Sequence, residues 1–416
     1  MIKIKKIVLS ALLLGVAFGA IVLIKKTIDS TYTASPNKKI LILTSFGGGG
    51  NLAASNALES YLKNDYDVQS CYVFKELLSS IDPLSYITGQ KHTGEELYNW
   101  LMPGKFFRVL GWIYYFGVWY FQLQKKTVQG ILHDYFAQIK PDLIISVIPI
   151  INNIVLDAAQ ELDIPFLLMP TDLDVKPYIV KIEKPTYKKF YVGIPFDDEE
   201  IKTPLHKAGV PESQIIIVGS PLRTNFFTQK NKPQLKKELA IDGGNPVIML
   251  LMGAHGSDEI KDYVAELLKV NNPMNIIACI GKNEKSRKDL AKLSIPPHIS
   301  LSVVGFTDRI ADYMAISDLF ISKSGTLSVS EALYMNLPLL LDATSALLPW
   351  EEFNHQFIKK HGFGDSIKKY RHIAPLITTI TGNSNQLEIY KNNIQNLEKK
   401  NCSLEAVKLI ERMLEK

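Results

Sequence analysis

Cysteine is scarce in this chain, and the few cysteines lie far apart. The 416 residues include three, Cys71, Cys279 and Cys402, with no paired-cysteine spacing. This pattern excludes a disulfide framework and a thiolate zinc site, and it fits a reducing compartment. A His-Glu-x-x-His motif is also missing, and we expect no bound metal. With 46% apolar residues and modest glycine and proline content, the chain is neither collagenous nor disordered, and its length predicts two domains.

Charge of one sign is lacking over most of the sequence. The formal net charge is +5, but residues 1–40 carry seven lysines against one aspartate, which leaves the other 376 residues at −1. A nucleic-acid-binding protein carries a basic excess on its folded body. The sequence therefore predicts no nucleic-acid partner.

Long apolar runs are missing except at the N-terminus. Residues 7–24 form 18 consecutive uncharged positions bracketed by Lys5-Lys6 and Lys25-Lys26. As a helix they span about 27 Å, close to the thickness of the bilayer core. We interpret them as a retained transmembrane anchor; a cleaved signal peptide is the alternative, although its apolar region is usually shorter and ends at small residues. The flanking lysines leave the orientation undecided.

Aromatic residues are concentrated in one segment. Ten of the 22 residues in 100–121 are aromatic, and the segment is interrupted by Pro103-Gly104. It is too broken for a membrane-spanning helix and is typical of an element at the membrane interface. An aromatic core helix or a dimer contact is the alternative interpretation.

Short β-type apolar runs alternate with helix-length segments, which predicts two parallel α/β sheets. A polar stretch at 221–245 separates the two sets. We therefore expect an anchor and linker at 1–35, an N-terminal Rossmann-like domain at 36–228, a C-terminal one at 229–384 and C-terminal helices at 385–416. Two doubly wound domains facing one another bind ligands in the crevice outside their strand ends. The expected strands of the first set are residues 40–44, 143–147, 166–169, 190–192 and 215–218; those of the second set are 247–251, 276–280, 301–304, 319–322 and 337–341.

Several segments occur in the order seen in one family. They are residues 44–55 (TSFGGGGNLAAS), 170–172 (PTD), 218–221 (VGSP), 281–283 (GKN), 304–307 (VGFT) and 314–332 (MAISDLFISKSGTLSVSEA). The chain resembles the monogalactosyldiacylglycerol synthase and processive diacylglycerol glucosyltransferase family, which is related to the family 28 peptidoglycan glycosyltransferases. The resemblance implies the GT-B fold and UDP-sugar-dependent transfer of a hexose.

The resemblance also implies roles for the C-terminal domain, which holds the nucleotide sugar in such enzymes. A helix N-terminus favours a diphosphate through its dipole and free N–H groups, and a carboxylate one turn later suits a ribose diol. His255 is a further candidate for the phosphates. The implied roles are Gly253 and Ser257 near the diphosphate, Phe306 beside the uracil, Ser324, Gly325 and Thr326 at the phosphates, Glu331 on the ribose, and Glu351 and Asn354 on the sugar hydroxyls.

The N-terminal domain departs from the family pattern. Asn51 stands where the family has a histidine after the glycine loop, and Lys176 occupies the place of a second histidine. An asparagine cannot take a proton near neutral pH, and a lysine is already protonated. Either Asp172 or Asp174 then supplies the base, the acceptor differs, or catalysis is lost. We choose Asp172, because it follows a buried strand and would project into the cleft.

The resulting functional hypothesis is a membrane-anchored enzyme that transfers a hexose from a UDP-sugar to a lipid hydroxyl such as that of diacylglycerol. We expect no cofactor besides this donor substrate, and catalytic domains on the cytoplasmic side, where UDP-sugars are made. A catalytically silent adaptor that binds lipid or nucleotide sugar at the membrane is the alternative, motivated by Asn51 and Lys176. A sugar-nucleotide epimerase is a third possibility, which leaves the anchor without a purpose.

Overall fold

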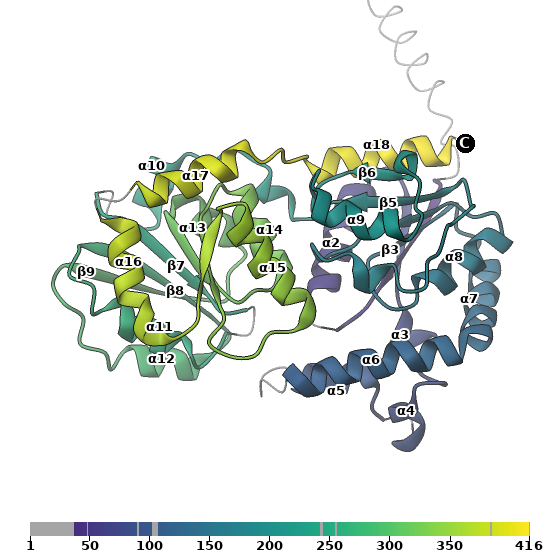
Figure 1. Ribbon diagram of the computed structural model, residues 1–416, viewed down its shortest axis with the longest axis horizontal. Helices are drawn as coiled ribbons and strands as arrows, with labels where there is room; N and C mark the ends of the chain where they lie inside the picture. Colours follow the sequence, from purple (N-terminus) through teal and green to yellow (C-terminus); the bar gives the residue numbers. More distant parts are fainter. Residues whose placement is uncertain are drawn as a thin grey trace, which may run out of the picture.

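The computed structural model describes residues 37–47, 49–89, 91–101, 107–241, 244–253, 256–382 and 385–415. These residues form two α/β halves, each built around a six-stranded parallel sheet (Figure 1). The predicted pair of doubly wound domains is therefore confirmed. The predicted anchor at residues 7–24 lies outside the described residues. Within the described ranges, no helix has both the length and the apolar character needed to cross a bilayer.

The N-terminal sheet has the strand order β2-β1-β3-β4-β5-β6, with all neighbouring pairs parallel. Strands β1, β3, β4, β5 and β6 are the apolar segments expected from the sequence, because a parallel sheet covered on both faces buries its strands. The edge strand β2 carries the polar residues Asp67, Gln69 and Ser70 and was not expected. The bounds are β1 Lys39–Thr44, β2 Asp67–Tyr72, β3 Leu143–Ser146, β4 Phe166–Leu168, β5 Phe190–Ile194 and β6 Ile215–Ile217.

The C-terminal sheet repeats this plan in the order β12-β11-β10-β7-β8-β9. Its edge strand β12 is short and polar, and a Cβ on Gly364 would overlap the carbonyl oxygen of Leu339 on the neighbouring strand. The bounds are β7 Val247–Leu251, β8 Met274–Gly281, β9 Ile299–Gly305, β10 Leu319–Ser322, β11 Leu339–Asp342 and β12 Gly364–Ile367.

Helices cover both sheets (Figure 1). Those of the N-terminal half are α2 Gly50–Leu62, α3 Val73–Glu76, α4 Pro83–Ile87, α5 Gly94–Leu101, α6 Phe107–Leu123, α7 Lys125–Ile139, α8 Asn152–Glu161 and α9 Glu199–Lys207. Those that follow are α10 Lys232–Glu238, α11 Ile260–Leu267, α12 Glu284–Leu290, α13 Ile310–Ile316, α14 Thr326–Tyr334, α15 Pro349–Lys360, α16 Ile373–Thr381, α17 Gln386–Asn396 and α18 Cys402–Leu414.

Helix α18 returns to the first half of the molecule (Figure 1). Its buried apolar side chains share one core cluster with Ala54, Leu58 and Leu62 of α2. Where the chain crosses back to the N-terminal half, the carbonyl oxygen of Lys400 accepts a 2.6 Å hydrogen bond from the Tyr334 hydroxyl of α14. A side chain at Gly219 would collide with that same carbonyl, and Gly219 has a φ of 88°. The last helix therefore completes the N-terminal half.

Candidate functional site

A cavity of about 1400 Å³ lies between the two halves. It is lined by loops at the carboxyl ends of strands from both sheets, where doubly wound domains bind their ligands. The N-terminal half contributes the wall that we call the acceptor wall, with Asn51 and Asp172. The C-terminal half contributes the donor wall, with Gly253, Gly325 and Glu331.

The donor wall centres on the first turn of α14. Gly325 is the N-cap, and no side chain caps the free N–H groups of this turn. Gly325 and Thr326 line the cavity, whereas Ser324 is buried behind them. An uncapped helix N-terminus facing a cavity is suited to bind a phosphate group.

Glu331 lies on the same helix and is only 6% exposed, although it lines the cavity. Its Oε1 atom is 3.5 Å from Nη2 of Arg223, which comes from the segment after β6 in the N-terminal half. Burial raises the pKa of Glu331 to about 7, and the Arg223 guanidinium opposes this rise. Arg223 was not expected as a site residue, although it lies two residues after the Val-Gly-Ser-Pro segment that pointed to the family.

Two other predicted donor residues lie in the cavity wall. Gly253 lies two residues after β7 and has a φ of 87°, which a glycine adopts without strain. Phe306 is two-thirds exposed after β9, and the Lys282 ammonium lies 4.9 Å from its ring centre. An exposed ring in this position offers a flat surface for stacking. Ser257 lies outside the wall, with its hydroxyl near Glu259, and His255 lies outside the described residues.

The two predicted sugar-binding residues of α15 are placed differently from one another. Glu351 lines the cavity and its carboxylate accepts a 3.0 Å hydrogen bond from the Leu348 backbone. Burial raises the pKa of Glu351, opposed by that bond and by Lys323. Asn354 is fully buried instead, and its amide donates to the Ser324 carbonyl oxygen and the Thr326 hydroxyl. Asn354 therefore supports residues 324–326 from the side away from the cavity.

On the acceptor wall, Asp172 lies at the point where the two halves meet. Its Oδ1 accepts a 2.7 Å hydrogen bond from the Thr326 hydroxyl across the cleft, and its Oδ2 lies 2.7 Å from the Tyr178 hydroxyl. Burial raises the pKa of Asp172, partly opposed by these two hydroxyls. A carboxylate between the two walls is placed to act on an acceptor hydroxyl beside a bound donor.

Asp174 is held away from the cavity. It is buried, and its Oδ1 accepts a 3.1 Å hydrogen bond from the Lys176 backbone and lies 3.9 Å from the Lys176 ammonium. Asp172 and Asp174 have the spacing of an Asp-x-Asp pair, but only Asp172 faces the space that a ligand could enter. Of the two aspartates left open by the sequence, the geometry favours Asp172.

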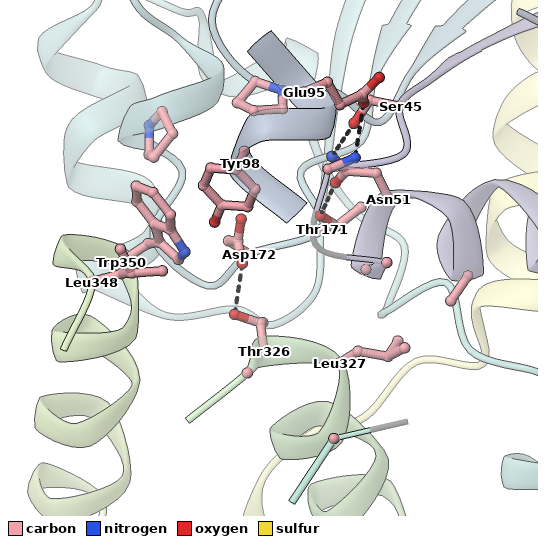
Figure 2. A pocket seen from close by; sticks show the side chains of 18 of the residues that line it. Ser45, Asn51, Glu95, Tyr98, Thr171, Asp172, Thr326, Leu327, Leu348 and Trp350 are labelled. Atoms are coloured by element: carbon pink, nitrogen blue, oxygen red, sulfur yellow. Dashed lines mark hydrogen bonds between the residues drawn. The ribbon is translucent and has the colours of Figure 1, made fainter. Parts of the chain in front are cut away.

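Asn51 connects further side chains of this wall. Its amide donates to the Ser45 hydroxyl over 2.9 Å and accepts from the Thr171 hydroxyl over 2.9 Å (Figure 2). Glu95 on α5 reaches the same place, where its Oε1 accepts a 2.8 Å bond from the Gly47 backbone. Burial raises the pKa of Glu95, opposed by bonds from Gly47, Phe46 and Ser45. The glycine loop thus holds a carboxylate of the chain itself, which no sequence motif had indicated.

Aromatic side chains cover the outer edge of the cavity. Tyr114 of α6 contacts Trp350 of α15 with ring centres 5.2 Å apart, so α6 reaches the donor half. Other large side chains of α6 face outward, and Trp112 and Trp119 are 77% and 58% exposed. Phe116 and Tyr120 of the same helix also line the cavity. The exposed aromatic face of α6 is therefore continuous with the cavity.

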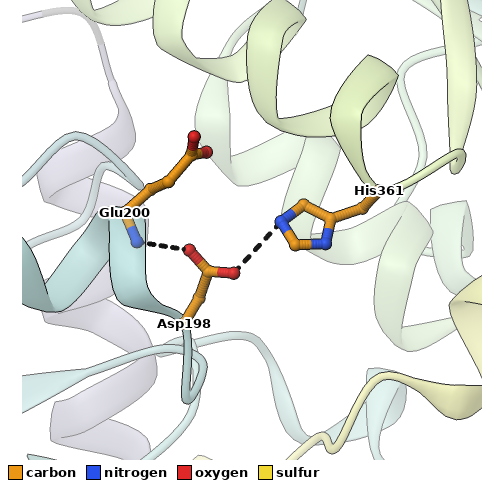
Figure 3. A group of neighbouring side chains, drawn as sticks. All are labelled: Asp198, Glu200 and His361. Atoms are coloured by element: carbon orange, nitrogen blue, oxygen red, sulfur yellow. Dashed lines mark hydrogen bonds and ion pairs between the residues drawn. The ribbon is translucent and has the colours of Figure 1, made fainter.

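A group of acidic and basic side chains joins the halves elsewhere (Figure 3). Asp198 caps α9, and its Oδ2 lies 3.0 Å from Nε2 of His361. Glu200 pairs with Lys360 over 2.7 Å. The three possible metal ligands Asp198, Glu200 and His361 are thus already engaged in ion pairs. They do not line the cavity.

Comparison with known proteins connects this architecture to one family. Residues 247–401 match the Glycosyltransferase family 28 C-terminal domain. Proteins named processive diacylglycerol beta-glucosyltransferase from Bacillus cytotoxicus and Bacillus mycoides are each 27% identical over 320 residues, covering 73% of this chain and 76% of the relative. The resemblance drawn from the sequence is confirmed.

Solved structures share the fold across both halves. MurG of Acinetobacter baumannii superposes with a TM-score of 0.56 at 14% identity, covering 91% of this chain and 100% of the other. A UDP-glucosyltransferase from Polygonum tinctorium gives a TM-score of 0.59 at 13% identity, covering 92% and 100%. At these identities the structures show a common GT-B fold and nothing finer.

Proposed function

We propose that this chain, which belongs to the family 28 glycosyltransferases of the GT-B fold, transfers a hexose from a UDP-sugar to the hydroxyl of a membrane lipid such as diacylglycerol. The observation that carries the proposal is the cavity between the two halves, in which an uncapped helix N-terminus and a carboxylate face each other. The relatives named as diacylglycerol glucosyltransferases support the choice of donor and acceptor.

The donor would lie along the donor wall. Its diphosphate would meet the N-terminus of α14, and its uracil would stack near Phe306. Glu331 would leave Arg223 to accept from the ribose hydroxyls, and Arg223 would then be free to neutralise a phosphate. No metal is needed in this arrangement, because the helix N-terminus and the guanidinium offset the charge that develops on the leaving diphosphate.

The acceptor would approach along α6. In the reaction, Asp172 takes the proton from the acceptor hydroxyl while the oxygen of that hydroxyl forms a bond to the anomeric carbon. The bond from that carbon to the diphosphate oxygen breaks, and its electron pair leaves with UDP. A single displacement of this kind inverts the anomeric carbon. Closure of the two halves would bring the reacting atoms together, and the Asp172–Thr326 hydrogen bond joins the two walls.

The exposed aromatic face of α6 would rest in the headgroup layer of the bilayer, where tryptophan and tyrosine side chains are favoured. Because this face is continuous with the cavity, a lipid could enter without passing through water. We further propose that residues 7–24 anchor the chain, with the catalytic halves on the cytoplasmic side.

The test uses the full chain in vesicles that contain diacylglycerol, with UDP-glucose or UDP-galactose as donor. Mass spectrometry of the extracted lipid is expected to show one added hexose for one of the donors, together with release of UDP. Binding of UDP without any turnover for either donor would contradict the enzyme and leave the alternative, a silent lipid or nucleotide-sugar adaptor.

A further inference from the structure

Three aromatic side chains of the cavity lie close to Asp172. Tyr98 comes from α5 and Tyr114 from α6, both in the N-terminal half, whereas Trp350 comes from the first turn of α15 in the C-terminal half. All three line the cavity, and Figure 2 shows Tyr98 and Trp350 in the same part of it as Asp172. These aromatic side chains therefore come from both halves of the molecule.

The polar ends of the three aromatic side chains have no partner within the part of the chain that the structure describes. There, no hydrogen bond involves the hydroxyl of Tyr98, the hydroxyl of Tyr114 or the indole N–H of Trp350. The contact between Tyr114 and Trp350 is one of ring edge on ring face, with an interplanar angle of 61°. Tyrosine hydroxyls and tryptophan N–H groups usually find a partner when they are removed from water. These three groups are therefore available to a bound ligand.

Two carboxylates face the same space. Burial raises the pKa of Tyr98, and the charges of Glu351 and Asp172 raise it further, so this hydroxyl keeps its proton and can donate it. Glu351 uses its Oε2 atom to accept from the Leu348 backbone, and within the described ranges its Oε1 atom accepts no hydrogen bond. This part of the cavity therefore combines flat apolar surfaces with free donors and a free carboxylate oxygen.

The place of this group in the cavity corresponds to the sugar of the donor. Asp172, the proposed base, accepts a 2.7 Å hydrogen bond from Thr326 in the first turn of α14, where the diphosphate would bind. In a UDP-sugar, the unit that lies between the diphosphate and the base is the hexose. A pyranose ring presents C–H groups on its faces and hydroxyls around its rim. Aromatic rings suit the faces, and phenol, indole and carboxylate groups suit the rim.

We propose that Tyr98, Tyr114 and Trp350 form, together with Glu351, the subsite that binds the hexose of the donor. Trp350 covers one face of the sugar ring, and the two tyrosine hydroxyls bind hydroxyls on its rim. This deepens the proposed function, on which the choice of a UDP-hexose rests. The nucleotide then binds to the donor wall alone, whereas the hexose binds to residues of both halves. It is therefore the hexose that holds the halves closed.

The first test is calorimetric titration of the full chain in phosphatidylcholine vesicles, which contain no acceptor, with UDP, UDP-glucose and UDP-galactose. We expect Trp350→Ala to weaken binding of the tighter-binding UDP-hexose about tenfold, because an aromatic contact contributes about 1 kcal/mol. Binding of UDP should stay within about twofold of wild type, and Trp350→Phe should recover most of the loss. Unchanged binding of the UDP-hexose in Trp350→Ala, or an equal loss for UDP, would overturn the proposal.

The second test removes one hydroxyl of the N-terminal half. We expect Tyr98→Phe to weaken binding of the UDP-hexose about fivefold and to leave binding of UDP unchanged, because one hydrogen bond contributes about 1 kcal/mol. The matched control is Tyr86→Phe on α4, an exposed tyrosine that does not line the cavity and should change neither affinity. Normal donor binding in Tyr98→Phe with a raised KM for diacylglycerol would assign this group to the acceptor and overturn the proposal.

Neither titration needs turnover, so the two proposals can fail separately. A chain that binds a UDP-hexose through Trp350 and Tyr98 but transfers no hexose would contradict the proposed function and leave the sugar subsite intact. A chain that transfers hexose while both variants bind the donor like wild type would refute the sugar subsite alone.

Discussion

The two walls of the cavity differ in the chemical groups that they present, which are mainly backbone groups on the donor wall and side chains on the acceptor wall. The donor wall relies on backbone, with Gly253, Gly325 and the free N–H groups of α14 facing the space, and on one buried acid, Glu331. The acceptor wall relies on side chains joined in a network around Asn51. A backbone site constrains a few glycines and the helix start, so it leaves a recognisable motif. A side-chain network can be rebuilt with other residues, which explains why the acceptor wall departs from the family pattern.

Asp172 belongs to the acceptor wall but contacts both walls, so removing its charge should cause the largest loss of activity. We expect Asp172→Asn to lower kcat by about a hundredfold or more, because general base catalysis contributes about that much. Asparagine keeps the shape and the bond from Thr326. The measurement is the rate of UDP release in vesicles together with calorimetric binding of UDP. A variant that binds UDP normally but turns over like wild type would show that the base lies elsewhere.

A second change concerns the acceptor wall alone. Replacing Trp112 and Trp119 with serine removes two exposed aromatic rings from α6, and we expect kcat/KM for the lipid to fall about tenfold or more. Binding of UDP should not change, since neither ring lines the cavity. Quenching of tryptophan fluorescence by brominated acyl chains should fall in the same variant. Ile389→Ser, at an exposed position on α17, is the control expected to change neither quantity. An equal loss in the control would refute a specific membrane face.

A third change concerns the donor wall alone and depends on pH. The pKa of Glu331 is raised to about 7, so its ionised, hydrogen-bond-accepting form is lost as the pH falls through 7. We expect UDP to bind about fivefold to tenfold more tightly at pH 8 than at pH 6 beyond the change shown by Glu331→Gln, which cannot ionise. Calorimetric titrations of both proteins across this range give the difference. Parallel pH profiles for the two proteins would exclude Glu331 from ribose binding.

The smallest effect should come from the bond that joins the walls. Thr326→Val removes the hydroxyl that donates to Asp172 and accepts from Asn354, while Thr326→Ser keeps it. We expect the valine variant to raise KM for the donor about threefold and the serine variant to remain near wild type, because one hydrogen bond contributes about 1 kcal/mol. Identical kinetics for the two variants would show that this bond does not assist closure.

The sequence predicted the inner strands because a parallel sheet covered on both faces needs continuous apolar runs. It also predicted the edge strands β6 and β9, whose residues are mostly apolar, but it missed the edge strands β2 and β12, which carry more polar residues. The sequence predicted a phosphate site at Gly325 and Thr326 from the glycine and the following helix, and the structure places both residues in the cavity wall. Asn354 could be assigned to the region but not to its supporting role, because sequence spacing does not tell which side of a loop a side chain approaches.

Glu95 could not have been found in the same way. It lies on a helix that is distant in sequence from the glycine loop it contacts, and only the fold brings it to Gly47. Arg223 had a signal, because it lies two residues after a segment that pointed to the family. Sites built from backbone groups can therefore be recognised in a sequence, whereas networks between distant side chains require coordinates.

The return of α18 to the first half has a consequence for synthesis. Its apolar face fills the core beside α2, but it is translated after the whole C-terminal half. Domains generally fold in the order in which they leave the ribosome. Here the half that is made first is finished last, so its α2 surface stays uncovered while the second half is being made. We therefore expect the nascent chain to depend on chaperones until α18 has emerged, and holdase chaperones to bind the α2 surface during that interval.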